Sequence, residues 1–203
     1  MATFLKIGAV IALLVATASA TVVTSIPGGT ITGFPQIGYF GTGPVTFGNG
    51  VTWTAGSYHA VFGYGGTYDY GINGYWDNSW LAATNDPTAP MTFAFATPVY
   101  AVGGLMNYNP RYGNGVIAVY DATNTLIESY TLTFLTGGGH NTGAFYGFAE
   151  STPISYFTLS GAYVGITTYT SQATPSTPEP GSLVLLGTGL AGIAGVVRRK
   201  LIT

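Results

Sequence analysis

The densest group of side chains that could recognise a ligand lies between Tyr58 and Trp80, where glycine alternates with aromatic, Asp and Asn residues. Aromatic rings offer flat apolar faces with little rotamer entropy, and Asp and Asn side chains hydrogen-bond hydroxyl groups. Sugars present both kinds of surface, so the segment predicts a carbohydrate-binding site. Its candidate residues are Tyr64, Tyr68, Asp69, Tyr70, Tyr75, Trp76, Asp77 and Trp80. Aromatic residues are more often packed in a core, and the sequence leaves that alternative open.

The carboxylates of the same region also suggest a metal. Oxygen ligands for calcium could come from Asp69, Asp77, Asn85 and Asp86. Their spacing matches no EF-hand, and Asn85-Asp86 before Pro87 is equally typical of a turn. A calcium site therefore stays open, and no other cofactor is predicted.

Catalytic signals are few. The two histidines, His59 and His140, do not form a metal-ligand pair, and no Gly-x-Ser-x-Gly motif occurs. Two carboxylates such as Glu128 and Glu150 could serve a glycosidase if they converged. We expect a non-catalytic protein, with a glycan-active hydrolase as the less favoured alternative.

Charge and cysteine content exclude several classes of function. Residues 21–177 contain one basic residue, Arg111, against six acidic residues, which leaves a formal charge of −5. Nucleic-acid binding requires clustered Lys and Arg, so it is excluded. The chain has no cysteine, which excludes disulfides, thiolate metal sites and cysteine catalysis. For Arg111, a carboxylate partner and an acidic sugar are both consistent with the sequence.

The elements that must position these residues are strands. Short runs of strand-forming residues are broken by Gly, Pro and Asn, which predicts an all-β, two-sheet, jelly-roll-like sandwich over residues 21–170. Pro98 is expected to separate two strands. The clearest hairpin runs from Val116 to Leu135, with its turn at residues 121–124 and Glu128 at the sheet rim. The expected strands are 45–47, 51–54, 59–62, 91–96, 99–105, 116–120, 145–149, 154–159 and 163–169.

Both ends of the chain have the character of targeting segments. Lys6, an apolar run at residues 7–15 and Ala18-Ser19-Ala20 predict a helical signal peptide over residues 1–20, so that cleavage leaves Thr21 as the mature N-terminus. Residues 171–180 have linker composition. The uncharged residues 181–197 are long enough for a short transmembrane helix, within a C-terminal segment of residues 181–203. The basic residues Arg198, Arg199 and Lys200 would stay cytoplasmic.

The order of Pro178-Glu179-Pro180, a Gly- and Leu-rich apolar helix and a basic end resembles the PEP-CTERM sorting signal of bacterial surface proteins. The resemblance implies an exosortase partner that recognises Pro178, Glu179 and Pro180 and processes the tail. It also implies a diderm, exopolysaccharide-producing bacterium. The protein would be exported, anchored through its C-terminal helix before processing, and then located at the outer surface or in the extracellular matrix.

A second resemblance covers the middle of the chain. The stretches 97–103, 119–121 and 145–148, with Pro153-Ile154, are similar to jelly-roll domains common in PEP-CTERM proteins. Those domains resemble carbohydrate-binding modules and legume-lectin-like sandwiches. The matching residues are mostly core and turn residues, so the resemblance implies a fold and transfers no site. The predicted function is a non-catalytic surface or matrix protein associated with exopolysaccharide that binds glycan. A purely structural coat or biofilm protein is the alternative.

Overall fold

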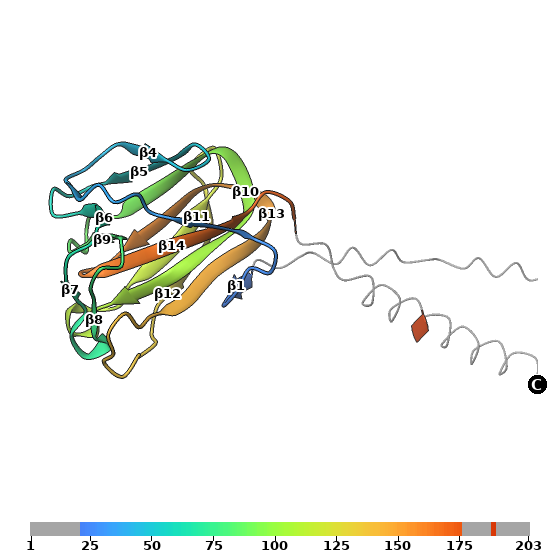
Figure 1. The fold of residues 1–203 in the computed structure, drawn as a ribbon. Coiled ribbons are helices and arrows are strands. Elements are labelled where there is room, and N and C mark those ends of the chain that lie inside the picture. Colours follow the sequence, from blue (N-terminus) through green and yellow to red (C-terminus); the bar gives the residue numbers. More distant parts are fainter. Residues whose placement is uncertain (1–20, 176–187, 190–203) are drawn as a thin grey trace, which may run out of the picture.

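The computed structural model describes residues 21–175 and 188–189, which contain the β-sandwich that the sequence predicts (Figure 1). The predicted signal peptide, the Pro-Glu-Pro motif and the basic end lie outside the described residues. The predicted C-terminal helix lies outside them as well, apart from Thr188 and Gly189. In the part of the chain that the structure describes, no helix has the length and apolar character needed to cross a membrane.

The strands are short except for two. They are β1 (Thr21–Val23), β2 (Thr30–Gly33), β3 (Tyr39–Phe40), β4 (Val45–Phe47), β5 (Val51–Ala55), β6 (Val61–Tyr64), β7 (Tyr68–Asp69), β8 (Tyr75–Trp76), β9 (Leu81–Thr84), β10 (Met91–Tyr108), β11 (Val116–Tyr120), β12 (Leu126–Thr131), β13 (Ala144–Ser160) and β14 (Val164–Gln172). Two short 3-10 helices, η1 (Gly71–Asn73) and η2 (Pro110–Tyr112), interrupt them.

The long strands β10 and β13 each contribute to both layers of the sandwich. The first part of β10 pairs with β5 and with the second part of β13, and β4, β11 and β12 extend this layer. The second part of β10 pairs with β14 and with the first part of β13. In that layer β1 joins β13, β2 and β9 pair with different parts of β14, and β6 and β3 follow β9.

The prediction that Pro98 separates two strands is wrong, because β10 continues through it. The register between β10 and β13 shifts on both sides of Val99, where the strands pass from one layer to the other. Pro153 lies at the corresponding bend of β13. A proline fits here because the regular ladder is already interrupted and its missing N–H leaves no pair broken.

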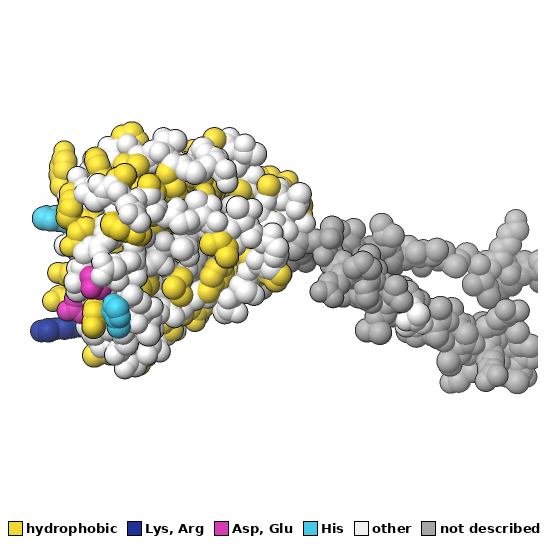
Figure 2. Space-filling model, in the orientation of Figure 1, with side chains coloured by type: hydrophobic (Ala, Val, Ile, Leu, Met, Phe, Trp, Pro, Cys, Tyr) yellow, Lys and Arg dark blue, Asp and Glu magenta, His cyan; other side chains and the backbone are white. Residues whose placement is uncertain are grey.

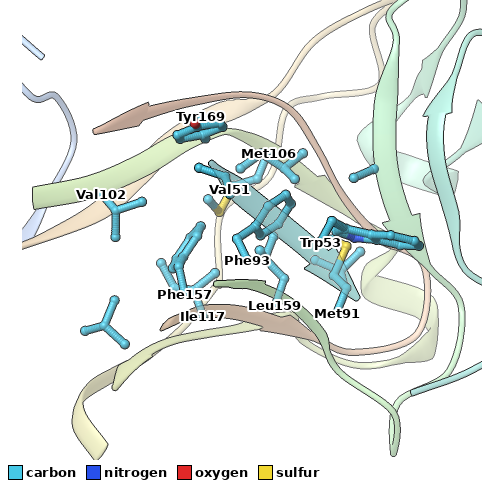
Figure 3. Packing of buried hydrophobic residues seen from close by; sticks show 14 of the residues in the cluster. Val51, Trp53, Met91, Phe93, Val102, Met106, Ile117, Phe157, Leu159 and Tyr169 are labelled. Carbon is cyan, nitrogen blue, oxygen red and sulfur yellow. The ribbon is translucent and has the colours of Figure 1, made fainter. Parts of the chain in front are cut away.

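The core lies between the layers and is mainly aromatic. Along β10, Met91, Phe93 and Phe95 point inward, as their alternation with Thr92 and Ala94 predicts. Figure 3 shows the rings of Phe93 and Phe157, which come from paired positions on β10 and β13 and stack side by side, with Trp53 beside Met91. A second, smaller cluster forms under the segment that the sequence singles out for ligand binding.

The β11–β12 hairpin forms as predicted. The Asp121 carboxylate accepts hydrogen bonds from the backbone N–H groups of Thr123 and Thr125, at 2.8 and 2.9 Å. Asn124 has a positive φ of 62°, which Asn tolerates better than most residues. The Thr123 hydroxyl also donates to Asp121, and these bonds lower the pKa of the Asp121 carboxyl.

The two ends of the described domain lie on one row of the sheet. Thr21 is opposite Ala149, Ala149 is opposite Ala101, and Ala101 is opposite Gln172. From Ala101 the strand runs to Tyr108, roughly 23 Å away at about 3.3 Å per residue. We call residues 68–78, 109–113 and 135–143, which gather at the Tyr108 end, the distal cap. Figure 1 shows β7 and β8 at that end and the start of β1 at the other.

Candidate functional site

The distal cap is organised around the buried side chain of Asn73. Its amide nitrogen donates to the carbonyl oxygens of Tyr108 at 3.1 Å and Phe134 at 3.4 Å. Its amide oxygen accepts from the backbone N–H of Thr136 at 3.1 Å. One side chain therefore joins η1, the end of β10 and the segment after β12. Such a fully bonded polar group in a buried site fixes the loops around it.

Further hydrogen bonds tie the loop at residues 135–143 to β8, to β10 and to Asp77. Asn107 donates to the carbonyl oxygens of both Asn73, at 2.9 Å, and Thr142, at 3.0 Å. The Trp76 indole also donates to the Thr142 carbonyl oxygen. At the surface, Asn141 and Asp77 exchange two side-chain-to-backbone hydrogen bonds, at 2.8 and 3.0 Å. The cap is thus held in place by its own side chains, which lowers the ordering cost of binding a ligand.

Two of the predicted glycan-binding residues are core residues. Tyr70 and Trp76 are both 0% exposed and pack with Val61, Leu81 and Ala83. Their rings meet edge to face at 4.9 Å. The hydroxyl of Tyr70 has no hydrogen-bond partner among the described residues, and burial raises the pKa of Tyr70. Neither ring is accessible to a sugar, so both residues are packed in the core, which is the alternative that the sequence left open.

Tyr64 and Tyr68 are half-buried and pack against this cluster. Tyr68 lies 5.2 Å from the Tyr70 ring, and its hydroxyl is buried without a partner among the described residues. Burial raises the pKa of Tyr68. The ring of Tyr64 meets the exposed ring of Phe40 at 5.4 Å, outside the cap. These two tyrosines are mainly supports for the cap.

The exposed members of the predicted set are Tyr75 and Asp69. Tyr75 is 45% exposed, and its ring lies 5.0 Å from the ring of the exposed His140. The carboxylate of Asp77, next to Trp76, accepts from Thr67 at 3.3 Å and from Asn78 at 3.2 Å. Asp69 accepts from the backbone N–H of Gly71 at 2.8 Å. The cap therefore presents an aromatic pair flanked by carboxylates.

Arg111 stands in the same cap, on η2. Its guanidinium lies 5.9 Å from the ring centroid of the exposed Tyr112, which stacks at 4.9 Å on Tyr163. Figure 2 shows the charged and histidine side chains of the visible face gathered at the end of the sandwich that carries β7 and β8 in Figure 1. On this face, the side chains that can carry charge are therefore concentrated at the end that bears the distal cap.

Trp80 lies outside the distal cap. It is half-buried over Gly65 and lines a surface groove of about 270 Å³ beside β2 and β14. Gly33, Ser79, Thr167 and Thr168 line the same groove. The predicted residues thus divide between the cap, the core beneath it and this groove.

The four predicted calcium ligands are not brought together. Within the described residues, no group of three or more His, Cys, Asp or Glu side chains is placed to hold a metal ion. Asp86 lies outside the cap and accepts from both the N–H and the hydroxyl of Thr88, at 2.9 and 2.8 Å. These bonds lower the pKa of Asp86 and fit its alternative interpretation as a turn residue.

The carboxyls of Glu128 and Glu150 do converge, although the sequence placed Glu128 only at a sheet rim. They are joined by a hydrogen bond between β12 and β13. Glycosidases hold their two carboxyls about 5–9.5 Å apart, so directly bonded carboxyls do not have that geometry. Burial, followed by the hydrogen bond and charge of Glu128, raises the pKa of Glu150 to about 7.

The sequence did not indicate the buried, bridging role of Asn73, the bonds of Asn141 or the pairing of His140 with Tyr75. His140 lies 65 positions from Tyr75, in a glycine-rich loop. The nearest signal was the cluster at residues 137–139, because Gly137 and Gly138 have positive φ and let the loop fold back onto η1 and β8.

Comparisons with known proteins concern mainly the C-terminal segment. A family model for the PEP-CTERM protein-sorting motif matches residues 176–200, which confirms the predicted motif. The motif indicates an exported protein that is processed by exosortase and anchored through its C-terminal tail before sorting. No curated protein matches the chain.

One solved structure is similar to part of the sandwich. It is the His 62 mutant of the lectin binding domain of Lectinolysin complexed with Lewis b, at 9% sequence identity and a TM-score of 0.40. The match covers 67% of this chain and 100% of that chain. A similarity of this size carries no argument about the present protein.

Proposed function

We propose that the protein is a non-catalytic surface protein that is held through its C-terminal tail and binds glycan with its distal cap. The observation that carries the proposal is the exposed Tyr75–His140 ring pair, which is flanked by carboxylates on loops fixed by buried hydrogen bonds. The cap lies at the opposite end of the sandwich from Gln172, after which the chain continues to the sorting motif.

The chemistry of the cap suits a sugar better than a nucleic acid, which would need clustered Lys and Arg. The Tyr75 ring offers an apolar face for the C–H side of a pyranose, and Asp69 and Asp77 offer acceptors for its hydroxyls. Arg111 beside Tyr112 adds one cation, which would favour a glycan that carries carboxylate groups. An acidic exopolysaccharide is accordingly the ligand we propose.

We further propose that the chain is processed at both ends. Removal of residues 1–20 leaves Thr21 at the N-terminus, residues 21–170 form the ectodomain and residues 171–180 form the linker. The tail at residues 181–203 anchors the chain until exosortase acts at Pro178, Glu179 and Pro180. The protein then resides at the outer surface or in the extracellular matrix.

The test uses the full chain, exported from its own precursor and purified in detergent, with exopolysaccharide of the host and a glycan array as probes. Tyr75→Ala should weaken binding about tenfold, because losing one stacking ring costs roughly 1–2 kcal/mol. Tyr58→Ala, which removes a ring that is 83% exposed outside the cap, is the matched control and should change nothing. Trp80→Ala reports on the groove. If only this variant loses binding, the cap is not the site; if the wild type binds no glycan at all, the proposed function fails.

A structural coat protein is the second candidate, because apolar side chains stand exposed on short strands. Ile31 on β2 is 73% exposed and Phe40 on β3 is 63% exposed. Exposed strands with apolar side chains are suited to edge-to-edge assembly. Sedimentation of the wild type and of Ile31→Lys and Phe40→Lys variants distinguishes the two functions. Concentration-dependent assembly that either variant abolishes, without glycan binding, would favour the coat protein.

A further inference from the structure

The Glu128–Glu150 pair lies in the space between the two layers, near the edge that β1 and β12 border. Glu150 is 7% exposed and Glu128 is half-buried. One carboxyl oxygen of each, Oε2 of Glu128 and Oε1 of Glu150, is buried without a hydrogen-bond partner in the described structure. A buried carboxylate that lacks a partner is costly, so this pair needs either a proton or a cation.

Among the residues that the structure describes, side chains do not provide that cation in this region. The sequences of β1 and of β10 to β14 contain no Lys, Arg or His, and Arg111 stands in the distal cap. Asp121 is engaged in the turn of the β11–β12 hairpin. The other titratable side chains of the strands packed around the pair are phenols, which are neutral near pH 7. They are Tyr100 and Tyr108 on β10, Tyr120 on β11, Tyr130 on β12, Tyr146 and Tyr156 on β13, and Tyr169 on β14.

The backbone of β1 brings a possible cation to this place. Thr21 is the residue opposite Ala149, which directly precedes Glu150. Opposed residues of antiparallel strands have their Cα atoms about 4.5–5.5 Å apart. Val22 packs on the core opposite the buried Phe148, so alternation turns Glu150 toward the same inner side. The nitrogen of Thr21 is the backbone atom of this residue that lies toward Glu150 along the ladder.

We propose that cleavage after Ala20 creates at Thr21 an α-ammonium group that pairs with the Glu150–Glu128 carboxyls and fastens β1 to the edge of the sandwich. This inference rests on the cleavage that the proposed function includes. Before cleavage the Thr21 nitrogen is an uncharged amide, and the carboxyl pair must retain a proton. After cleavage the ammonium is the missing counter-ion, and processing itself completes the packing of the edge.

The change of charge alters how Glu150 titrates. In the uncleaved chain, burial raises the pKa of Glu150 to about 7, so its carboxyl exchanges a proton near neutral pH. An ammonium at Thr21 stabilises the carboxylate and lowers the pKa of Glu150, and the carboxylate in turn raises the pKa of the α-amine. The mature protein should therefore be much less sensitive to pH between 5 and 7.5 than a chain whose N-terminus is uncharged.

The sequence permits an unusually clean test, because the chain from Thr21 onward contains a single lysine, Lys200. In a Lys200→Arg precursor that is exported, processed and purified in detergent, the mature N-terminus is the one remaining amine. N-terminal sequencing identifies the cleavage point, and acetylation then removes the charge at that amine alone. Carbon-13 labelling of glutamate follows Glu150 by NMR, and thermal unfolding is measured from pH 5 to 7.5.

We expect sequencing to begin at Thr21 and the Glu150 midpoint to lie about one or more pH units lower in the free-amine chain than in the acetylated chain. The melting temperature of the acetylated chain should fall across this pH range, whereas that of the free-amine chain should change little. In Glu150→Gln, acetylation should have no pH-dependent effect. Equal midpoints in the two chains that both begin at Thr21 would overturn the ion pair and leave the proposed function intact. A different first residue would overturn both the ion pair and the proposed cleavage.

Discussion

Asn73 and Thr136 bond to one another twice across 63 residues of sequence. The backbone N–H of Thr136 donates to the Asn73 side chain at 3.1 Å, and the Thr136 hydroxyl donates to the Asn73 carbonyl oxygen at 2.7 Å. This pairing holds the loop at residues 135–143 against η1. The exposed Tyr75–His140 pair depends on it, because Tyr75 begins β8 shortly after η1 and His140 lies in the loop.

Replacing Asn73 with alanine should lower the free energy of unfolding by about 2–4 kcal/mol. The substitution leaves the carbonyl oxygens of Tyr108 and Phe134 and the N–H of Thr136 without their buried partner. Urea unfolding of the full chain measures the loss. Asn114→Ala, at an exposed position, should stay within about 0.5 kcal/mol of the wild type. A loss no larger than that of the control would mean that the network does not stabilise the cap.

Tyr70→Phe should stabilise the protein by about 1–2 kcal/mol. The substitution removes a hydroxyl that is fully buried without a partner in the described structure, while the ring keeps its contact with Trp76. Tyr108→Phe makes the opposite change, because the Tyr108 hydroxyl donates to the Phe134 carbonyl oxygen at 3.0 Å. Thermal unfolding should place the first variant above the wild type and the second below it. A destabilised Tyr70→Phe would show that the hydroxyl is bonded in solution.

Gly74→Ala should destabilise the cap by at least about 1–3 kcal/mol. Gly74 has a φ of 83°, and a Cβ at this position would collide with the backbone of Gly139. Gly33→Ala, where a Cβ meets nothing within 4 Å, is the control and should be close to neutral. Hydrogen exchange at Tyr75 and Asn141 locates the effect, because both N–H groups bond within the cap. Unchanged exchange in Gly74→Ala would contradict the close approach.

The uncleaved chain should lose stability as the pH rises from about 4.5 to about 7. Burial and Glu128 raise the pKa of Glu150 to about 7, above the value of 4.5 that it has when exposed. The folded state therefore binds more protons than the unfolded state in this window, and raising the pH favours unfolding. Below pH 4.5 the carboxyl is protonated in both the folded and the unfolded state, so the stability is at its full value there and does not change further with pH. Chemical unfolding at several pH values checks this, and Glu150→Gln should flatten the curve. A stability that rises through the window would contradict the assignment.

The sequence predicts the parts of this protein that depend on local pattern. Alternation along Met91–Phe95 identifies a strand with one buried face, and Asp121 to Asn124 identify a turn, because both signals involve neighbouring residues. Pro98 misled for the same reason. Proline is normally excluded from a central strand because it cannot donate to the ladder. That expectation does not apply to β10, which bends from one layer to the other at the point where its regular pairing with β13 is interrupted.

The site is less predictable because exposure is a property of the whole fold. Tyr75 and Trp76 are adjacent and similar in chemistry, yet strand alternation turns one ring outward and the other into a core. Nothing near them in the sequence says which ring meets solvent, since that depends on the loop that returns more than 60 residues later. The carboxyls of Glu128 and Glu150 meet for an equally non-local reason, through the facing of two layers.

The row that joins Thr21, Ala149, Ala101 and Gln172 has a mechanical consequence. A ligand that pulls on the distal cap while the tail holds Gln172 applies tension parallel to β14. Eight residue pairs join β14 to β10, and a force along their common axis loads them together in shear rather than peeling them one by one. A sandwich loaded in this direction resists traction far better than one pulled apart across its strands, and this is the load that the proposed glycan binding would place on a chain anchored through its tail.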